Sequence, residues 1–358
     1  MADGLVFFTG FPGFIGRRIV SRLLKDDPEV RVACLVEEKM LDNARKCAEQ
    51  YDASDRIEVI PGDIGERDLG VDKETYERLA AETTSAYHLA AIYNLAVPFD
   101  IAQRVNVDGT GNVLDLCRRA DKLERLNYVS TAYVAGMRTG TVYEHELNMG
   151  QEHKNHYEST KYQAEIWVRE IMDKVPTTIY RPAIVVGDSQ TGETEKFDGP
   201  YYILRTFQRT GGAPLAQFGR AEAPFNVVPV DFIVDAITAA AKDPEAVGET
   251  LHLVDPEPVT AAQLFKTLAS EYTGREPKLK VPPKLVENSL RSSTVSKAFY
   301  GAPRESIQYL NHPVKFDTRR AEDILARSGV HCPAFDEYVG NMVKFFREHE
   351  DDEAFAPA

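Results

Sequence analysis

A tyrosine and a lysine one helical turn apart are the residues of this chain best suited to chemistry: Tyr157 and Lys161 in HYESTKYQAE. Positions i and i+4 of a helix share a face, so both side chains can act on one site. An isolated phenol titrates at about pH 10, which makes it a poor proton donor or acceptor at neutral pH. A neighbouring ammonium favours the phenolate, so we expect Lys161 to lower the pKa of Tyr157 and prepare it for general acid–base catalysis.

A glycine string near the N-terminus, TGFPGFIG, places Gly10, Gly13 and Gly16 between an apolar strand and a helix. Glycine allows a tight turn, a close approach of the backbone to a diphosphate, and close packing of helix on sheet. A simple turn is the alternative, but a position at the first strand–helix junction favours a dinucleotide site. The same turn contains further residues expected to contact the coenzyme: Phe11, Phe14 and Ile15.

An acidic residue, Glu37, follows the second apolar stretch and predicts the choice of coenzyme. A carboxylate there accepts hydrogen bonds from the ribose hydroxyls and repels a 2′-phosphate, which favours NAD(H) modestly over NADP(H). Alternatively Glu37 starts a solvated loop, and Arg17 and Lys39 lie close enough to bind a phosphate. Asp63, after a third apolar stretch, would bind the adenine amino group or cap the next segment.

Two hydroxyl side chains, Ser130 and Thr131, end the apolar stretch RLNYVST. Active groups of open parallel sheets gather at the carboxyl ends of strands. A hydroxyl there can hydrogen-bond a substrate carbonyl and stabilise developing negative charge. We therefore place Ser130 and Thr131 with Tyr157 and Lys161 in one catalytic group.

The elements that must position these residues alternate between strand and helix. Strands are expected at 4–9, 31–36, 56–63, 85–91, 125–131 and 177–186, and helices after Gly16 and over 106–120 and 156–174. This alternation predicts an α/β fold, a Rossmann-type doubly wound parallel sheet. We expect a dinucleotide-binding domain over 1–187, to which 225–256 return. The other segments are expected to form a small substrate-binding lobe (188–224 and 257–347) and a flexible tail (348–358).

Composition limits the function of this chain, which has 358 residues and a net charge of −14. An acidic chain lacks the basic footprint that nucleic acids and anionic membranes require, so neither is an expected partner. The four cysteines have no metal or redox spacing, and no metal site is predicted. With neither a signal peptide nor a membrane-spanning stretch expected, a cytoplasmic enzyme with a small-molecule substrate is the natural prediction.

Several motifs together resemble the extended short-chain dehydrogenase/reductases: TGFPGFIG, PGDI, HLAA, NVDGT, VSTAYVAG, YESTK and YRPAIVVG. The resemblance implies that Thr131 is the catalytic hydroxyl, with Ser130 beside it, and that Asn106 supports the active-site helix. It also implies that Lys161 binds the nicotinamide ribose. Further coenzyme contacts would come from Ile64, Leu89, Ala90, Ala91, Pro182 and Ile184. Members of this family commonly dimerise through helices that correspond here to 100–120 and 157–174, so a homodimer is possible.

Within that family, the segments around 129–136, 179–206 and 225–237 are most similar to the thioester-reductase and fatty acyl-CoA reductase (male-sterility-type) branch. The resemblance implies NAD(P)H-dependent reduction of an acyl thioester, or of the aldehyde that it yields. An apolar substrate would suit a cleft lined by Phe197, Tyr201, Tyr202, Phe299 and Tyr300. The alternative is that these aromatic residues form the core of the lobe.

Two other functions stay open on the sequence. A nucleotide-sugar epimerase or dehydratase uses the same fold and catalytic residues with tightly bound NAD, and Arg205, Arg209 and Arg220 would have to bind its diphosphate. A non-catalytic dinucleotide-binding regulator is the third possibility. The combination of Thr131, Tyr157 and Lys161 counts against a regulator, because a sensor does not need a tuned phenol.

Overall fold

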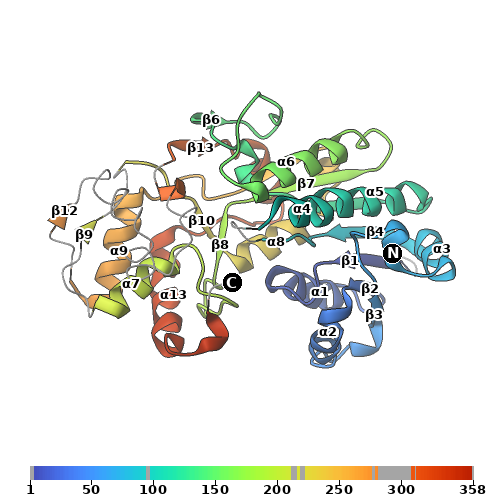
Figure 1. Cartoon of the computed structure of the whole chain (residues 1–358), viewed down its shortest axis with the longest axis horizontal. Helices are drawn as coiled ribbons and strands as arrows, with labels where there is room; N and C mark the ends of the chain where they lie inside the picture. The colour runs from blue at the N-terminus through green and yellow to red at the C-terminus, as the bar shows by residue number, and fades with distance from the viewer. Residues whose placement is uncertain are drawn as a thin grey trace.

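A seven-stranded parallel sheet forms the centre of the computed structural model, which describes residues 4–93, 97–210, 216–217, 222–275, 279–280, 308–310 and 312–356 (Figure 1). The strand order is β11-β7-β5-β4-β1-β2-β3, and every pair in it is parallel. The strands are β1 (Leu5–Thr9), β2 (Arg31–Val36), β3 (Ile57–Pro61), β4 (Thr83–His88), β5 (Arg125–Val129), β7 (Thr177–Pro182) and β11 (Thr250–Leu253). The predicted doubly wound fold is confirmed.

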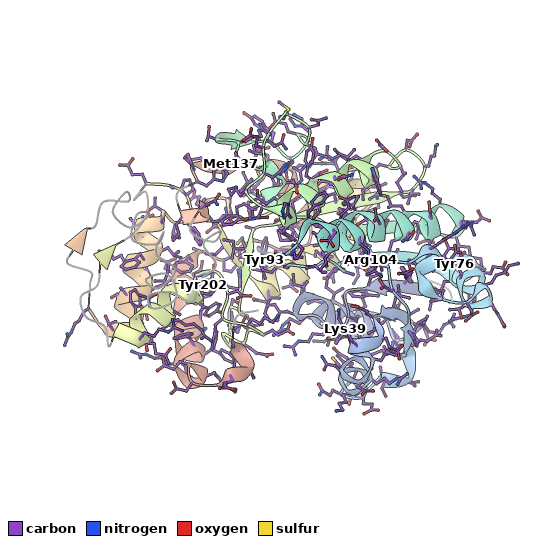
Figure 2. All side chains as sticks on the ribbon, viewed as in Figure 1. Lys39, Tyr76, Tyr93, Arg104, Met137 and Tyr202 are labelled. Atoms are coloured by element: carbon purple, nitrogen blue, oxygen red, sulfur yellow. The ribbon has the colours of Figure 1, made fainter. Side chains whose placement is uncertain are left out.

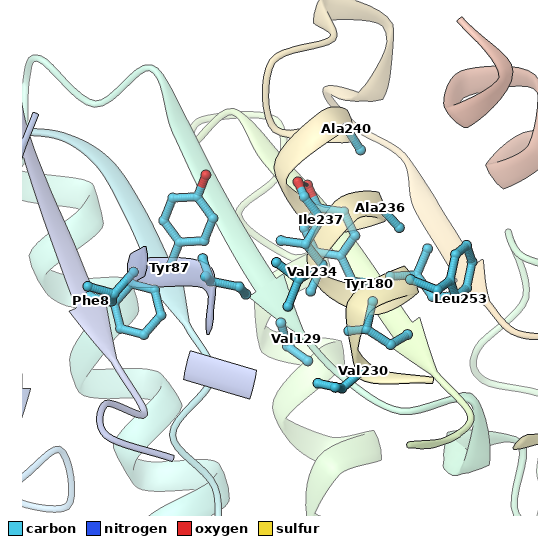
Figure 3. Packing of buried hydrophobic residues seen from close by; sticks show 14 of the residues in the cluster. Phe8, Tyr87, Val129, Tyr180, Val230, Val234, Ala236, Ile237, Ala240 and Leu253 are labelled. Atoms are coloured by element: carbon cyan, nitrogen blue, oxygen red, sulfur yellow. Dashed lines mark hydrogen bonds between the residues drawn. The ribbon is translucent and has the colours of Figure 1, made fainter. Parts of the chain in front are cut away.

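Helices cover both faces of the sheet, which is why most of its strand residues are buried, except in the edge strand β3. One face packs on α1 (Phe14–Asp26), α2 (Leu41–Ala48), α8 (Val230–Ala240) and α12 (Arg319–Ala326). The other packs on α3 (Lys73–Glu82), α5 (Gly109–Arg119) and α6 (His156–Arg169). Figure 3 shows the first of these cores, where Val230, Val234 and Ile237 of α8 lie against Tyr180 of β7. Helix α8 is apolar on nearly all sides, as expected of a buried helix.

The chain reverses its direction of winding between β1 and β4, which are neighbours in the sheet. Ligands of doubly wound sheets bind outside the carboxyl ends of the strands at such a switch point. The glycine turn follows β1, residues 89–93 follow β4, and Thr131 follows β5. The sheet therefore brings these three sequence motifs to one edge.

A second, smaller unit lies beside the sheet, at the left of Figure 1. Its helices are α7 (Tyr201–Thr210), α9 (Ala261–Thr273) and α13 (Phe335–His349). They enclose a core rich in aromatic residues, including Phe207, Phe265, Phe335 and Phe346. Three two-stranded parallel sheets flank this unit and the main sheet: β8 (Ile184–Val186) with β10 (Val227–Pro229), β6 (Gly140–Val142) with β13 (Val314–Phe316), and β9 (Ala216–Gln217) with β12 (Leu279–Lys280).

The aromatic residues expected to line a substrate cleft belong mainly to this core. Phe197 is fully buried and packs on Tyr201, whose hydroxyl accepts a hydrogen bond from Gly187 N at 3.1 Å. Tyr202 is also buried. Core packing, the alternative left open by the sequence, is therefore what the structure shows for Phe197 and Tyr201. Phe299 and Tyr300 lie outside the described residues.

The chain end, where the sequence predicts a flexible tail, is packed onto the lobe up to residue 356. The short helix Glu353–Phe355 stacks the Phe355 ring on Phe197 at a centroid distance of 5.1 Å. Phe197 N and the Arg205 guanidinium both donate to the Phe355 carbonyl oxygen, at 3.1 and 3.3 Å. An aromatic anchor and backbone hydrogen bonds thus hold a segment whose acidic composition alone suggests fraying.

Candidate active site

The glycine turn connects β1 to α1 at the carboxyl edge of the sheet. Gly10 has a φ of +96°, and Gly13 N donates to the Gly10 carbonyl oxygen at 3.0 Å. A Cβ on Gly16 would lie 2.3 Å from that same oxygen, and a Cβ on Gly10 would lie 2.9 Å from the Cβ of Leu89. Backbone and side chains therefore approach this turn too closely for residues larger than glycine.

The amino end of α1 is suited to an anion. Its N-cap is Gly13, its first turn contains no acidic residue, and within the described part of the chain no side chain caps it. The first amide groups of the helix thus lack an intrahelical acceptor, and its dipole favours negative charge. A dinucleotide diphosphate fits this turn. Beside it, Phe11 is buried, while Phe14 and Ile15 are half-buried.

The segment after β4 runs next to the glycine turn. Leu89 N donates to the Thr9 carbonyl oxygen, and Ala90 N donates to Thr9 Oγ1, both at 3.2 Å. Asn106 Oδ1 accepts from Ile92 N at 2.8 Å. These contacts fix the wall of the site that the motif HLAA forms.

Asn106 also connects this segment to the catalytic helix. It lies in the π-helical turn Gln103–Asp108, and its Nδ2 donates to Thr160 Oγ1 of α6 at 3.0 Å. Its carbonyl oxygen accepts from Thr110 Oγ1, which in turn contacts His88 Nε2 at 3.0 Å. Burial lowers the pKa of His88 to about 3, so its imidazole is neutral. The network beneath the site is therefore polar but uncharged at these positions.

The acidic residues predicted to meet the adenosine have different surroundings. Glu37 follows β2, its side chain is 47% exposed, and it pairs with Lys39 at 2.8 Å. Asp63 accepts from Gly65 N at 2.8 Å and from the Arg104 guanidinium at 2.6 Å. Arg104 is an ion-pair partner of Asp63 that the sequence did not suggest. Ile64, the next residue, is buried and packs on Gly109 of α5.

Thr131 and Ser130 point to different partners although they are neighbours. Ser130 Oγ donates to Glu165 Oε2 at 2.6 Å, inside a buried ion pair between Glu165 and Arg181. Thr131 Oγ1 accepts from Tyr133 N at 3.2 Å and lies 3.5 Å from the Pro182 carbonyl oxygen. Of the two hydroxyls, that of Thr131 lies close enough to the Tyr157 phenol to act on its pKa. Ile184, beyond Pro182, starts β8 and pairs with Val227.

Tyr157 lies in the first turn of α6. Asn155 caps this helix by accepting from Glu158 N at 2.9 Å, which fixes the helix start and hence the Tyr157 direction. The Tyr157 ring meets the edge of Tyr93 at a centroid distance of 5.1 Å. Burial raises the pKa of the Tyr157 phenol above its ordinary value, Tyr93 adds to this, and the nearby Thr131 hydroxyl opposes it.

Lys161 is buried one turn further along α6. Its Nζ donates to the Val129 carbonyl oxygen at 2.7 Å and lies 4.6 Å from the centroid of the Tyr128 ring. Burial lowers the pKa of Lys161 to about 7. The expected lowering of the Tyr157 pKa by this lysine is not seen, because burial dominates and the Lys161 head group is directed to the end of β5.

One residue beside the catalytic phenol, Tyr93, was not singled out from the sequence as a site residue. Tyr93 comes two positions after the HLAA motif, and it is 54% exposed although its ring touches Tyr157. From the lobe side, Tyr202 donates to Asp198 Oδ1 at 3.0 Å, and both interact electrostatically with Tyr93. Figure 2 shows Tyr93 and Tyr202 at the boundary between sheet and lobe. Its position just beyond the carboxyl end of β4, where active groups of parallel sheets gather, is the sequence signal that could have identified Tyr93 as a site residue.

Comparison with known proteins identifies the family. The family model described as "Male sterility protein" matches residues 8–237, which is more than half of the chain. The chain belongs to this family of extended short-chain dehydrogenase/reductases. It is an oxidoreductase with a nicotinamide dinucleotide-binding domain, as the motifs predicted.

Individual relatives are similar over most of this chain. An aldehyde reductase of Aspergillus flavus is 30% identical over 277 residues, which are 71% of this chain and 26% of that protein. A carboxylic acid reductase of Mycobacterium marinum is 26% identical over 285 residues, 70% of this chain and 24% of that protein. This chain thus matches about a quarter of the length of these curated relatives.

Among solved structures, the terminal R domain from the myxalamid PKS-NRPS biosynthetic pathway superposes with a TM-score of 0.83 at 26% identity. The superposition covers 99% of this chain and 93% of that domain. The likeness therefore extends through the small lobe as well as the parallel sheet.

Among the described residues, none of the helices is both long and apolar enough to span a bilayer.

Proposed function

We propose that this enzyme uses NAD(P)H to reduce the carbonyl carbon of an acyl thioester, or of the aldehyde that the thioester yields. The observation that carries the proposal is that the strand-end residue Thr131 and Tyr157 of α6 lie together at the carboxyl edge of the sheet, beside the glycine turn, so that the Thr131 hydroxyl acts on the Tyr157 phenol. When bound, the coenzyme would supply the hydride. Its diphosphate would lie at Gly10–Gly16.

The proposed roles of the protein groups follow from their surroundings. Thr131 orients the substrate oxygen, and the Tyr157 hydroxyl donates its proton to that oxygen as negative charge develops there. A phenol whose pKa lies above its ordinary value is protonated at neutral pH, which suits a proton donor. Lys161 would bind the coenzyme ribose and hold the end of β5 through Val129. Ser130 and Asn106 would support this group through their hydrogen bonds to α6.

The proposed substrate is a carrier-bound or coenzyme A-bound acyl chain, or the corresponding aldehyde. The names of the relatives support this class, since they are an aldehyde reductase, a carboxylic acid reductase and a terminal R domain. The Tyr93 ring, which is 54% exposed and meets the Tyr157 ring, offers an apolar surface with a polar edge. We therefore retain the prediction of a largely apolar substrate and place it against this ring.

For the coenzyme we retain NAD(H) over NADP(H). Glu37 offers a carboxylate after β2, and Lys39 is already paired with it. Arg17 and Arg18 both pair with Glu193, at 2.9 and 3.1 Å, so neither is free for a 2′-phosphate in this structure. A higher kcat/KM with NADPH than with NADH would refute this preference.

A homodimer through α5 and α6 is the proposed assembly, testable by sedimentation.

The decisive experiment is a coenzyme-oxidation screen at neutral pH. NADH and NADPH are each offered with acyl-CoAs of increasing chain length, a phosphopantetheinylated carrier thioester, free aldehydes, ketones and nucleotide sugars. We expect oxidation of coenzyme with thioesters or aldehydes, and thiol release with thioesters only. Turnover of nucleotide sugars without net coenzyme oxidation would instead support the epimerase alternative. Arg205, one of three arginines suggested for that function, packs over the Phe197 ring, and Arg220 lies outside the described residues.

A further inference from the structure

A buried polar cluster lies directly beside the catalytic tyrosine. Glu158, the residue after Tyr157, is fully buried. Its Oε1 accepts from Lys154 Nζ at 3.2 Å and from the Tyr309 hydroxyl at 2.7 Å, while its Oε2 accepts from Lys154 N at 2.9 Å. The Lys154 side chain is only 1% exposed. An ion pair and a phenol are thus enclosed together at the start of α6.

Tyr309 reaches this cluster from a distant part of the chain, residues 308–310. Besides donating to Glu158, its hydroxyl accepts from Asn155 Nδ2 at 3.0 Å. Asn155 is the residue whose Oδ1 caps α6. The cap residue Asn155 and Glu158 in the first turn of α6 are therefore both hydrogen-bonded to the Tyr309 hydroxyl.

The same cluster also contacts the residues that hold the Thr131 hydroxyl. Lys154 Nζ donates to the Gly136 carbonyl oxygen at 2.7 Å, and Gly136 ends the short helix Ala132–Ala135 that Thr131 caps. The Tyr309 ring meets the edge of the Tyr133 ring at a centroid distance of 4.8 Å. Tyr133 N is the donor that holds Thr131 Oγ1. One cluster therefore contacts the supports of both Thr131 and Tyr157.

We infer that Tyr309, together with Lys154 and Glu158, is a positioning unit that sets the Thr131 and Tyr157 hydroxyls relative to each other. This inference rests on the proposed function. A buried ion pair contributes little net stability compared with apolar residues of similar size, because both charges must be desolvated. Its directed hydrogen bonds do, however, fix geometry between segments far apart in sequence. A misplacement of reacting groups by about 1 Å can cost about 100-fold in rate.

The test replaces Tyr309 by Phe, which removes the hydroxyl and keeps the ring on Tyr133. Tyr272→Phe is the matched control, because Tyr272 also donates to a glutamate, Glu350 Oε2, at 2.7 Å, but in the packing of α9 on α13. We expect Tyr309→Phe to lower kcat about 10- to 100-fold, with coenzyme Kd and substrate KM within about threefold. Tyr272→Phe is expected to keep kcat within about twofold. Glu158→Gln, which keeps size but loses charge, should resemble Tyr309→Phe.

A second measurement does not depend on activity. Hydrogen exchange of the Tyr133 and Glu158 amides should accelerate in Tyr309→Phe and stay at the wild-type rate in Tyr272→Phe. Unchanged exchange at both amides, or a wild-type kcat in Tyr309→Phe, would overturn the positioning role. Failure of the proposed function shows itself differently: wild-type enzyme would then bind coenzyme yet oxidise it with none of the thioesters and aldehydes.

Discussion

Replacement of Tyr157 by Phe is the most direct test of the proposed chemistry, because it removes one oxygen atom and little else. The phenyl ring can keep its edge-to-face contact with the Tyr93 ring, whose centroid lies 5.1 Å from that of Tyr157. The substitution eliminates the proposed proton donor and its interaction with the Thr131 hydroxyl. Any loss of turnover can then be assigned to the hydroxyl, provided that folding and coenzyme binding are unchanged.

The expected loss can be worked from these contacts. A positioned general acid contributes roughly 10²- to 10⁴-fold to rate, which corresponds to about 2.7 to 5.4 kcal/mol of activation free energy. The stability change should be much smaller. Even a full hydrogen bond between neutral groups contributes only about 1 kcal/mol net, and the removal of a half-buried hydroxyl also relieves its desolvation. We therefore expect kcat to fall at least 100-fold while the unfolding temperature moves by only a few degrees.

The assay follows coenzyme absorbance during turnover, and a separate titration measures coenzyme Kd through the fluorescence of the single tryptophan, Trp167 on α6. Tyr162→Phe is the control, since Tyr162 lies on the same helix with its ring against His153, at 4.8 Å. We expect the control to keep wild-type kcat and both variants to keep wild-type Kd. A Tyr157→Phe enzyme with more than a tenth of wild-type kcat would refute the assignment of Tyr157 as proton donor.

Three further predictions concern the supports of the site. Gly16→Ala should weaken coenzyme binding at least tenfold in a titration, because its Cβ would lie 2.3 Å from the Gly10 carbonyl oxygen. Thr131→Val should lower kcat about 100-fold, whereas Thr131→Ser should retain most of it in the same assay. Glu144 is buried, and its carboxylate accepts hydrogen bonds from the backbone amides of His252, Arg320 and Ala321. Burial raises the pKa of Glu144 to about 7 from 4.5, so the folded state binds its proton more tightly than the unfolded state. The free energy of unfolding should therefore fall by about 3 kcal/mol as pH rises from about 4.5 to about 7, and Glu144→Gln should flatten this slope in urea titrations.

The fold and the glycine turn after β1 could be predicted because their signals are local. A parallel strand buried on both faces needs a continuous apolar run, and LVFFT and RVACLV are such runs. The spacing of Gly10, Gly13 and Gly16 reflects backbone contacts within a few residues. Alternating strands and helices admit few other arrangements, so a doubly wound parallel sheet with active groups at the carboxyl ends of its strands could be expected.

The remaining parts of the site depend on contacts between distant segments, which residue types alone do not encode. Ser130 and Thr131 are adjacent hydroxyls, and only the position of Glu165 on α6 decides which of them turns away from the site. Phe197 could have lined a cleft or filled a core, and the choice depends on Phe346 and the chain end. Tyr309 carried no motif, because its partner Glu158 lies 151 positions earlier.

The surroundings of Tyr157 also bear on the direction of the reaction. The sequence suggested a phenol whose pKa is lowered by Lys161, which would serve as a base for alcohol oxidation as readily as an acid for carbonyl reduction. In the structure burial raises the pKa of Tyr157 and lowers that of Lys161 to about 7. Both shifts have the same cause, since an enclosed site disfavours each charged form. A neutral phenol can donate a proton at once but must be deprotonated before it can accept one, so this protonation state matches the proton donor that the proposed reduction requires.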